Sequence, residues 1–344
     1  MSEPYRVAQW ATGNIGRKAL QGIVEHPAMT LAGLYVYDPE KVGHDAGELC
    51  GMDTVGVLAT GSIEDVVAAG ADCVLYMPRM FDADDVCVLL ESGANVVTTC
   101  GQFHHPPSMD AALRTLVEAF CEAGGASIHS TGSSPGFISE AVPLVLTSIQ
   151  RRLDSVSIEE YADLSKRNSP ELLFDIMGFG RALAPFHQAR ADHLSSSFGP
   201  SLRLVADAVG LPLDDVTAAG ELAAAPRDTD IAAGTLKAGT VAAQRITVSG
   251  LREGHELITF RATWYCTTDL EQAWELRDTG WRVAVHGDAP LDVELRMPVP
   301  LEQMAETSPG YTANRAVNLV AAVCAAPPGI RSTLDLPHAL ATFG

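Results

Sequence analysis

The stretch that decides the fold is Tyr5-Arg6-Val7-Ala8-Gln9-Trp10-Ala11-Thr12-Gly13-Asn14-Ile15-Gly16, near the start of the chain. It reads as a short buried strand that breaks at small residues and continues as a helix, because apolar residues recur at near-helical spacing from Ile15 onward. A helix that begins there directs several N–H groups, and the positive end of its dipole, at whatever lies in front of it. The stretch therefore predicts a site for a phosphate group.

The small residues of this turn match most of the G-x-G-x-x-G fingerprint of dinucleotide-binding proteins. Gly13 and Gly16 stand at its second and third positions, and Ala11 replaces its first glycine. We expect Ala11 to be tolerated there, since a methyl group costs little if the residue keeps a negative φ.

An acidic residue completes the pattern. A second apolar run, residues 29–37, ends at Asp38, which lies 22 residues beyond Gly16. A carboxylate at that distance can accept hydrogen bonds from the ribose of an adenine nucleotide. The alternative is an ordinary strand–helix–strand unit with a tight turn and a solvated Asp38. The dinucleotide interpretation predicts cofactor contacts by Thr12, Gly13, Asn14, Ile15, Gly16 and Asp38.

The composition is that of an ordinary globular protein. A chain of 344 residues, 47% of them apolar, is long enough for two domains with full cores. Its formal net charge of −20 argues against association with nucleic acid or an anionic membrane, since both carry the same sign. The seven cysteines are spread along the chain without a C-x-x-C pair, which favours reduced, buried thiols. With no secretory signal or membrane-spanning apolar run, we expect a cytoplasmic protein.

The remainder of the first 150 residues alternates strands with helices, about six strands in all. That order predicts an α/β fold, in which an N-terminal Rossmann domain at 1–150 has a parallel sheet covered on both faces. Ligands of such sheets bind beyond the carboxyl ends of the strands. This rule selects loops after the fourth, fifth and sixth strands, and the predicted cofactor contacts in the first two are Pro78, Arg79, Cys100 and Gly101.

A second domain is predicted at 151–310. Its strands are longer and alternate more clearly, and a segment rich in helix signals, 169–219, interrupts them. We expect an α+β domain with a mixed or antiparallel sheet. A closing helix within 311–330 is predicted to pack back on the first domain.

Several segments together resemble the dihydrodipicolinate reductase superfamily, and more closely its native amine dehydrogenases and 2,4-diaminopentanoate dehydrogenases. The resemblance covers nearly the whole chain and most of its motifs mark fold and cofactor. It rests on the segments 11–17, 45–51, 134–137, 177–180 and 311–330. It implies a nicotinamide-binding Rossmann domain, a second domain that supplies the substrate pocket and a homodimer contact, and hydride transfer to a C=N or similar bond of a small molecule.

The similar amine dehydrogenases place a catalytic Glu directly after the fifth strand. Here that loop reads Thr99-Cys100-Gly101-Gln102-Phe103-His104-His105 and contains no carboxylate. The chain must still supply a proton donor or a hydrogen bond to the substrate heteroatom. The candidate catalytic residues are His104 and Gln102 in this loop and Tyr161 at the exit of a second-domain strand. The alternatives are that the two histidines cap the loop and face solvent, and that Tyr161 belongs to an ordinary sheet edge.

The cofactor is predicted to be NAD or NADP. Asp38 favours NAD, because a carboxylate repels a 2′-phosphate, whereas Arg17 and Lys41 leave NADP open. No metal site is predicted, since the adjacent histidines lack a further ligand at suitable spacing. We therefore expect an NAD(P)-dependent oxidoreductase acting on an imine or carbonyl of a small apolar substrate. The rivals are a non-catalytic nicotinamide-binding sensor and a semialdehyde dehydrogenase with Cys100 as nucleophile.

Overall fold

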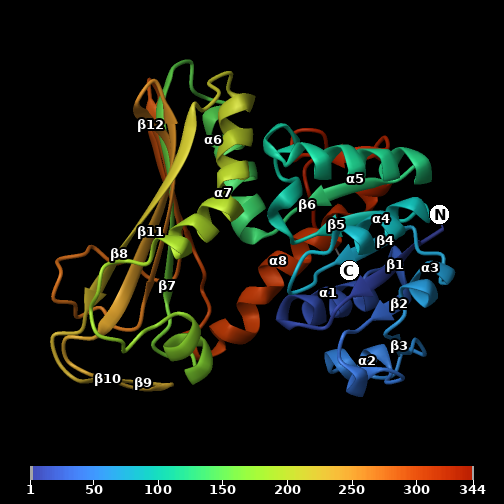
Figure 1. Ribbon diagram of the computed structural model, residues 1–344, viewed down its shortest axis with the longest axis horizontal. Coiled ribbons are helices and arrows are strands. Elements are labelled where there is room, and N and C mark those ends of the chain that lie inside the picture. Colours follow the sequence, from blue (N-terminus) through green and yellow to red (C-terminus); the bar gives the residue numbers. More distant parts are fainter. Residues whose placement is uncertain (1–2, 343–344) are drawn as a thin grey trace. The chain divides into compact units, whose positions relative to one another are not determined.

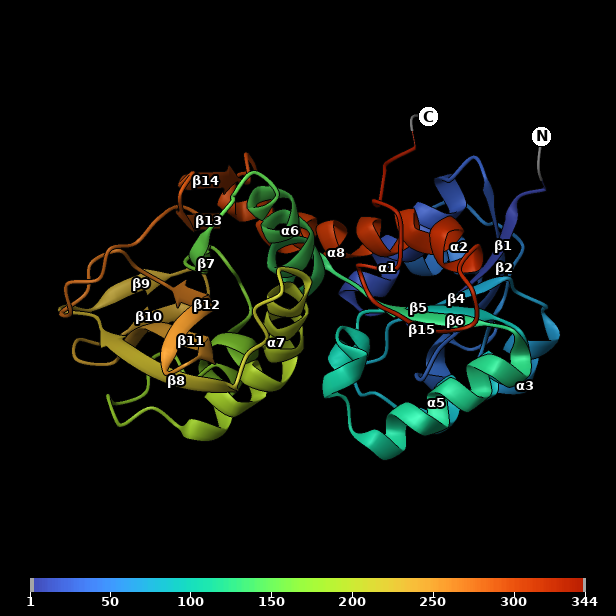
Figure 2. The same ribbon diagram turned by 90° about the horizontal axis from the view of Figure 1, so that it is seen from above.

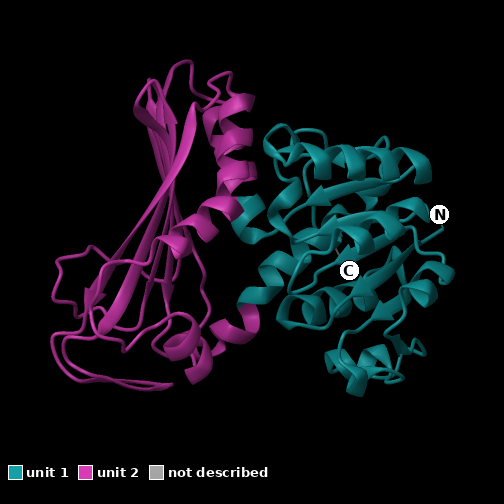
Figure 3. Cartoon of the chain, in the orientation of Figure 1, with its two compact units in different colours: residues 1–137, 308–344 teal, residues 138–307 magenta. Residues whose placement is uncertain are grey.

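The computed structural model describes residues 3–342 and divides the chain into two compact units. Unit 1 comprises residues 1–137 and 308–344, and unit 2 comprises residues 138–307 (Figure 3). The division falls within two segments that pass from one unit to the other, Ser133–Ala141 and the long helix α8.

Unit 1 is built on a seven-stranded parallel sheet in the order β15-β6-β5-β4-β1-β2-β3 (Figure 1). Helix α5 covers one face, and α1 and α8 cover the other (Figure 2). Its strands are β1 (Tyr5–Trp10), β2 (Met29–Tyr35), β3 (Ala59–Thr60), β4 (Cys73–Tyr76), β5 (Asn95–Thr98), β6 (Ser127–Ser130) and β15 (Gly329–Arg331). Its α-helices are α1 (Asn14–Glu25), α2 (Ala46–Cys50), α3 (Ile63–Ala68), α4 (Ala83–Glu91), α5 (Ala111–Gly124) and, from residue 308 on, α8 (Leu301–Cys324).

Neighbouring residues of β1 enter two different cores. Val7 packs with Ile23 of α1 and Val317 of α8, whereas Ala8 packs with Leu90 of α4 and Val117 of α5. Successive strand side chains point to opposite faces, so a sheet covered on both sides needs apolar residues at every position. The predicted Rossmann parallel sheet is confirmed.

Strand β15 is the seventh strand, where the sequence pattern predicts about six. It pairs with β6 in parallel, with Ile330 opposite Ile128. Three residues, Gly329–Arg331, are too few to show a periodicity, so the pairing is decided by the return of the chain after α8.

Asp45 holds the loop that follows η1 (Pro39–Lys41). Its carboxylate accepts hydrogen bonds from the N–H groups of Gly47, Val55 and Gly56 at 2.8 to 2.9 Å. These bonds cap α2 and tie both ends of the loop together. They hold the pKa of the Asp45 carboxyl below its usual value, with the Val55 bond as the largest cause.

Unit 2 contains a six-stranded mixed sheet in the order β14-β13-β7-β12-β11-β8. This confirms the predicted second α+β domain. Its strands are β7 (Leu153–Asp163), β8 (Asp215–Ala224), β11 (Val241–Arg252), β12 (His255–Tyr265), β13 (Gly280–Gly287) and β14 (Leu291–Arg296), beside a small ribbon of β9 (Thr229–Ile231) and β10 (Gly234–Leu236). Its helices are α6 (Val142–Thr147), η5 (Glu171–Ile176) and α7 (Gln188–Ala208).

One prediction for this unit is wrong at its edge. The helix-rich segment predicted at 169–219 extends into β8, which begins at Asp215 and pairs with β11. The run Ala218-Ala219-Gly220 lowers the strand signal, because Ala and Gly have low strand propensity. Pairing with β11 overrides that local preference.

The two faces of this sheet differ in character. Helix α7 packs on one face, where its Phe198 stacks on Phe260 of β12 with ring centroids 3.7 Å apart. The opposite face carries alternating charges, with Glu159 bridging Arg261 at 3.4 Å and Arg282 at 2.9 Å.

The Asp45 interactions predict a pH-dependent contribution to stability. Because the folded pKa lies below the ordinary value of 3.8, the stabilisation is complete well above that pH and is lost as the pH falls through the folded pKa. Asp45→Asn should lower the thermal unfolding midpoint at pH 7, since an amide cannot accept all three N–H bonds.

Thermal unfolding of wild type and variant from pH 3 to 8 checks this. The gap between them should shrink below about pH 4. Asp53→Asn, an exposed change in the same loop, is the control. A gap that stays constant down to pH 3 would contradict the assignment.

Candidate functional site

A cavity of about 520 Å³ lies at the carboxyl ends of β1, β2 and β4, where the phosphate site is predicted. We call it the cofactor cradle. Its lining residues are Ala11, Thr12, Gly13, Asn14, Ile15, Gly16, Tyr37, Asp38, Lys41, Met77, Pro78, Arg79 and Thr99. Eight of the ten predicted cofactor contacts lie in it together, and Cys100 and Gly101 follow directly after its residue Thr99.

The amino terminus of α1 forms one wall of the cradle. Gly13 is the N-cap residue, and no side chain of the described residues caps this end of the helix. A Cβ added at Gly13 would meet no atom within 4 Å, so it would project into open space. The N–H groups of the first turn are thus available to an anionic group, as a dinucleotide pyrophosphate requires.

Gly16 allows the close approach of α1 to the end of β1. A Cβ at this position would lie 2.2 Å from the carbonyl oxygen of Ala11, which is impossible without moving the backbone. The third glycine of the fingerprint therefore serves helix–strand packing here.

The expectation of a negative φ at Ala11 is wrong. Its φ is +73°, in the left-handed region that disfavours a residue with a Cβ. The Gln9 side chain fixes this geometry, because its amide nitrogen donates to the carbonyls of both Trp10 and Ala11 at 3.0 Å. Gln9 is fully buried and its contacts are formed only in the fold, so no sequence pattern revealed them.

Asp38 and Lys41 also line the cradle. The Asp38 carboxylate caps η1 by accepting the Glu40 N–H at 3.0 Å. The Lys41 ammonium donates to the Thr12 hydroxyl at 3.1 Å, across the mouth of the turn. A negative and a positive group therefore face the same end of the cavity.

The loop after β5 is held by Ser130 at the end of β6. The Ser130 hydroxyl donates to the Cys100 carbonyl at 2.6 Å and accepts the Phe103 N–H at 3.1 Å. Phe103 is fully buried in the core beside Phe81. One hydroxyl thus fixes both ends of the short helix η2 (Gly101–Phe103).

The two predicted catalytic residues of this loop, Gln102 and His104, lie in different surroundings. Gln102 is exposed, whereas His104 and His105 are buried, with 1% and 7% of their surfaces exposed. The alternative in which the histidines face solvent is therefore wrong. Burial raises the pKa of the Cys100 thiol, although a Thr98 hydrogen bond opposes this, so the thiolate that a nucleophile needs is disfavoured.

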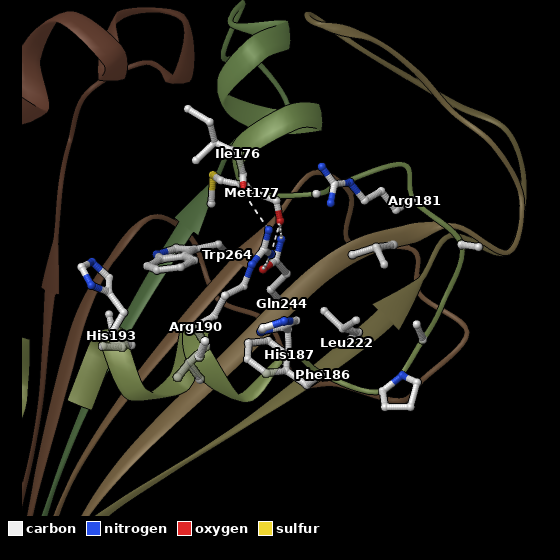
Figure 4. Close-up of a pocket in the computed structure, with 18 residues that line it drawn as sticks. Ile176, Met177, Arg181, Phe186, His187, Arg190, His193, Leu222, Gln244 and Trp264 are labelled. Carbon is white, nitrogen blue, oxygen red and sulfur yellow. Dashed lines mark hydrogen bonds between the residues drawn. The ribbon is translucent and has the colours of Figure 1, made fainter. Parts of the chain in front are cut away.

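Unit 2 has its own cavity, of about 690 Å³, which we call the unit 2 pocket (Figure 4). Residues of three strands line it on the sheet side, and residues of the segment 176–194 form the rest; the strand residues are Leu222 of β8, Val241, Gln244 and Ile246 of β11, and Trp264 of β12. Tyr161 does not line it. Trp264 is paired with Ala162, the neighbour of Tyr161 in β7, so the Tyr161 side chain points to the opposite, charged face of the sheet.

Two family models together cover most of the chain. The 2,4-diaminopentanoate dehydrogenase C-terminal domain matches residues 137–344, more than half of the protein. The chain belongs to this family. The amino-terminal domain of dihydrodipicolinate reductase matches residues 10–98, which include the cradle turn. The resemblance found in the sequence is thereby confirmed at the family level, and the protein is an NAD(P)-dependent oxidoreductase.

Individual relatives agree with this assignment. The chain is 29% identical over 347 aligned positions to an amine dehydrogenase of Streptomyces virginiae, with 95% of each chain covered. It is 24% identical to the 2,4-diaminopentanoate dehydrogenase of Acetoanaerobium sticklandii, over 83% of this chain and 79% of that one. The solved amine dehydrogenase of Mycobacterium smegmatis shares the fold, with a TM-score of 0.76, 19% identity and coverage of 98% and 97%.

Residues 3–342 contain no group of three His, Cys, Asp or Glu side chains that could hold a metal ion. In the same range, no helix is both long and apolar enough to cross a membrane.

Several cradle residues escaped the sequence prediction. Met77 and Thr99 directly follow β4 and β5, so the carboxyl-end rule could have found them. Tyr37 lies in the cradle because its hydroxyl accepts the Trp10 indole N–H at 2.9 Å. That hydrogen bond links β1 to the residues after β2, and no local sequence pattern predicts it.

The left-handed backbone at Ala11 predicts that Ala11→Gly stabilises the protein. Relief of the Cβ clash exceeds the added entropy of the unfolded chain, so the free energy of unfolding should rise by about 0.5 to 1 kcal/mol. Urea unfolding of both proteins measures it. Ala8→Gly, in the extended backbone of the preceding strand β1, is the control and should destabilise. A loss of stability in Ala11→Gly would contradict the strain at Ala11.

Proposed function

We propose that the protein transfers a hydride between NAD(P)H and the imine or carbonyl carbon of a small apolar substrate. It would act as an amine dehydrogenase or as a carbonyl or imine reductase. The observation that carries the proposal is the uncapped amino terminus of α1 in a cradle at the carboxyl ends of parallel strands. Membership of the diaminopentanoate dehydrogenase family supports it.

The chain's own residues divide the work of holding the cofactor. The turn 12–16 offers backbone N–H groups to the pyrophosphate, and Asp38 accepts from the adenine ribose. Pro78 and Arg79, after β4, line the cradle, and Cys100 and Gly101, which follow its residue Thr99, would extend the contact with the cofactor. The bound nicotinamide supplies the hydride, and the protein supplies its position against the reacting carbon.

We assign the contact with the substrate heteroatom to Gln102. Its amide is exposed in η2, and Ser130 fixes that short helix at both ends. His104 is a weaker candidate, because a side chain with 1% of its surface exposed cannot reach a substrate unless the loop moves. Tyr161 faces away from the unit 2 pocket and is left out of the proposal.

NAD is the proposed cofactor, since the Asp38 carboxylate would repel a 2′-phosphate. Wild type should bind NADH at least about tenfold more tightly than NADPH. Asp38→Ser should reduce or reverse this preference, because Lys41 then remains as the charged group at that end of the cradle.

Fluorescence titration of both reduced cofactors measures the effect. Glu40→Ser removes a neighbouring exposed carboxylate outside the cradle and is the matched control. Tighter binding of NADPH than of NADH to wild type would overturn the assignment.

The loop 99–105 contains no carboxylate, so it offers no acid that could catalyse the formation of an imine from a ketone and ammonia. Gln102→Glu should therefore increase ammonia-dependent reduction of ketones, by placing an acid where similar amine dehydrogenases carry theirs. Gln102→Ala should lower kcat/KM by about tenfold, the cost of about one hydrogen bond to the heteroatom.

Nicotinamide absorbance with ketones, with and without ammonia, measures both variants. Unchanged kcat/KM in Gln102→Ala would remove Gln102 from the site.

The rival from the sequence, a nicotinamide-binding sensor without catalysis, is disfavoured because the family and the relatives are dehydrogenases. Turnover of any ketone, imine, amine or alcohol would exclude the sensor.

A further inference from the structure

The unit 2 pocket is positively charged in a strongly acidic protein. The chain carries a formal charge of −20, yet the residues that line this pocket include Arg181 and Arg190 and no Asp or Glu. Among the described residues, neither guanidinium forms an ion pair with a carboxylate at a nitrogen–oxygen distance of 4.0 Å or less. Such uncompensated charge at one cavity indicates an anionic ligand group.

Arg190 is held in position by the chain around it. Its guanidinium donates to the carbonyls of Ile176 and Met177, at the carboxyl end of η5, and to the side-chain oxygen of Gln244 (Figure 4). The Gln244 amide nitrogen also donates to the Met177 carbonyl at 2.6 Å. Gln244 is 2% exposed, so it cannot swing away into solvent.

These three hydrogen bonds leave two N–H donors of the Arg190 guanidinium unused. It has five N–H donors, and the three bonds that the structure shows come from Nη1 and Nη2. The Nε–H and one N–H of Nη2 remain for a ligand. A carboxylate is the group that pairs best with two N–H donors of one guanidinium. The carbonyl contacts orient Arg190 without neutralising its charge.

Two aromatic side chains, Trp264 and Phe186, also line the pocket. The Trp264 indole is oriented by Glu160, which accepts the N–H groups of Trp264 at 3.4 Å and Trp281 at 3.1 Å. Phe186 lies flat on Gly220 of β8, where an added Cβ would approach its ring to 2.3 Å. A glycine in the strand therefore lets this ring close the pocket.

We propose that the unit 2 pocket binds the substrate as an organic acid. Its carboxylate pairs with Arg190, with Arg181 adding charge, and its apolar or aromatic body lies against Trp264 and Phe186. A volume of about 690 Å³ suits such a molecule. The substrate class is then an apolar oxo acid or the corresponding amino acid. A diamine without an acid group is excluded, because its ammonium groups would meet two guanidiniums. The assignment of this ligand as substrate rests on the proposed function, whereas its binding does not.

Calorimetric titration of the full chain with three compounds that share one body tests the charge preference. The probes are 3-phenylpropanoate, 3-phenylpropan-1-ol and 3-phenylpropan-1-amine. The acid should bind about tenfold or more tightly than the alcohol, and the amine most weakly. Arg190→Gln should abolish the preference for the acid, and Arg190→Lys should keep part of it. Trp264→Phe should weaken all three by a similar factor.

If Arg190→Gln does not fold, two further variants, one in the pocket and one outside it, still test whether positive charge at the pocket binds the acid. Arg181→Gln changes an exposed residue and should weaken the acid alone. Arg296→Gln removes an exposed arginine on β14, at the other edge of the sheet, and should change nothing. Equal binding of acid and alcohol by wild type would overturn the proposal, as would an equal loss in the Arg296 control.

Turnover separates this inference from the proposed function. The acid should inhibit hydride transfer competitively with substrate, and non-competitive inhibition would overturn its assignment to the substrate site. Turnover of neutral ketones without binding of the acid would overturn the inference and leave the proposed function standing. Acid binding without any hydride transfer would sustain the pocket and overturn the proposed function.

Discussion

The close approach of α1 to the end of β1 is the constraint on which the cofactor cradle depends. Gly16 permits it, since a Cβ there would lie 2.2 Å from the Ala11 carbonyl. The turn must then pass through a left-handed residue, and Ala11 takes that conformation at φ +73° with its carbonyl held by the Gln9 amide. The strain falls on Ala11, because β1 before the turn and α1 after it are both packed in the core and fix its ends. The helix terminus is thereby aimed at the cavity.

The same arrangement decides which neighbouring loops can contribute. Parallel strands end at one edge of the sheet, so the loops after β4 and β5 reach the cradle that β1 and α1 begin. The β5 loop is shaped from the next strand, because Ser130 contacts the backbone of both Cys100 and Phe103. Its exposed residue is therefore Gln102, and its histidines are turned inward. A side chain from β6 thus determines which group of the β5 loop is offered to a substrate.

The fold and most of the cradle were predictable, whereas the second site was not. Strand, turn and acid are local signals, and Gly13, Gly16 and Asp38 follow from them at fixed spacing. The position of Tyr161 at a strand exit favours a place in the substrate pocket, but one residue of register places it on the charged face of the sheet. Arg190, Gln244 and Trp264 come from three separate elements and share no sequence pattern. Because the Ala-Ala-Gly run has low strand propensity, the sequence pattern does not predict β8, which forms part of the same pocket.

By itself the sequence determined the alternation of strands and helices, the dinucleotide turn and the family. These features follow from periodicity, from backbone requirements of glycine and from short-range spacing, all of which act within a few residues. Only the tertiary structure decided the left-handed conformation of Ala11, the burial of His104 and the positive charge of the unit 2 pocket. Each depends on groups distant in the chain: the Tyr35 carbonyl that accepts the Ala11 N–H, Ser130 beneath the β5 loop, and the η5 carbonyls that orient Arg190. Contacts of that kind arise from packing, which no local pattern encodes.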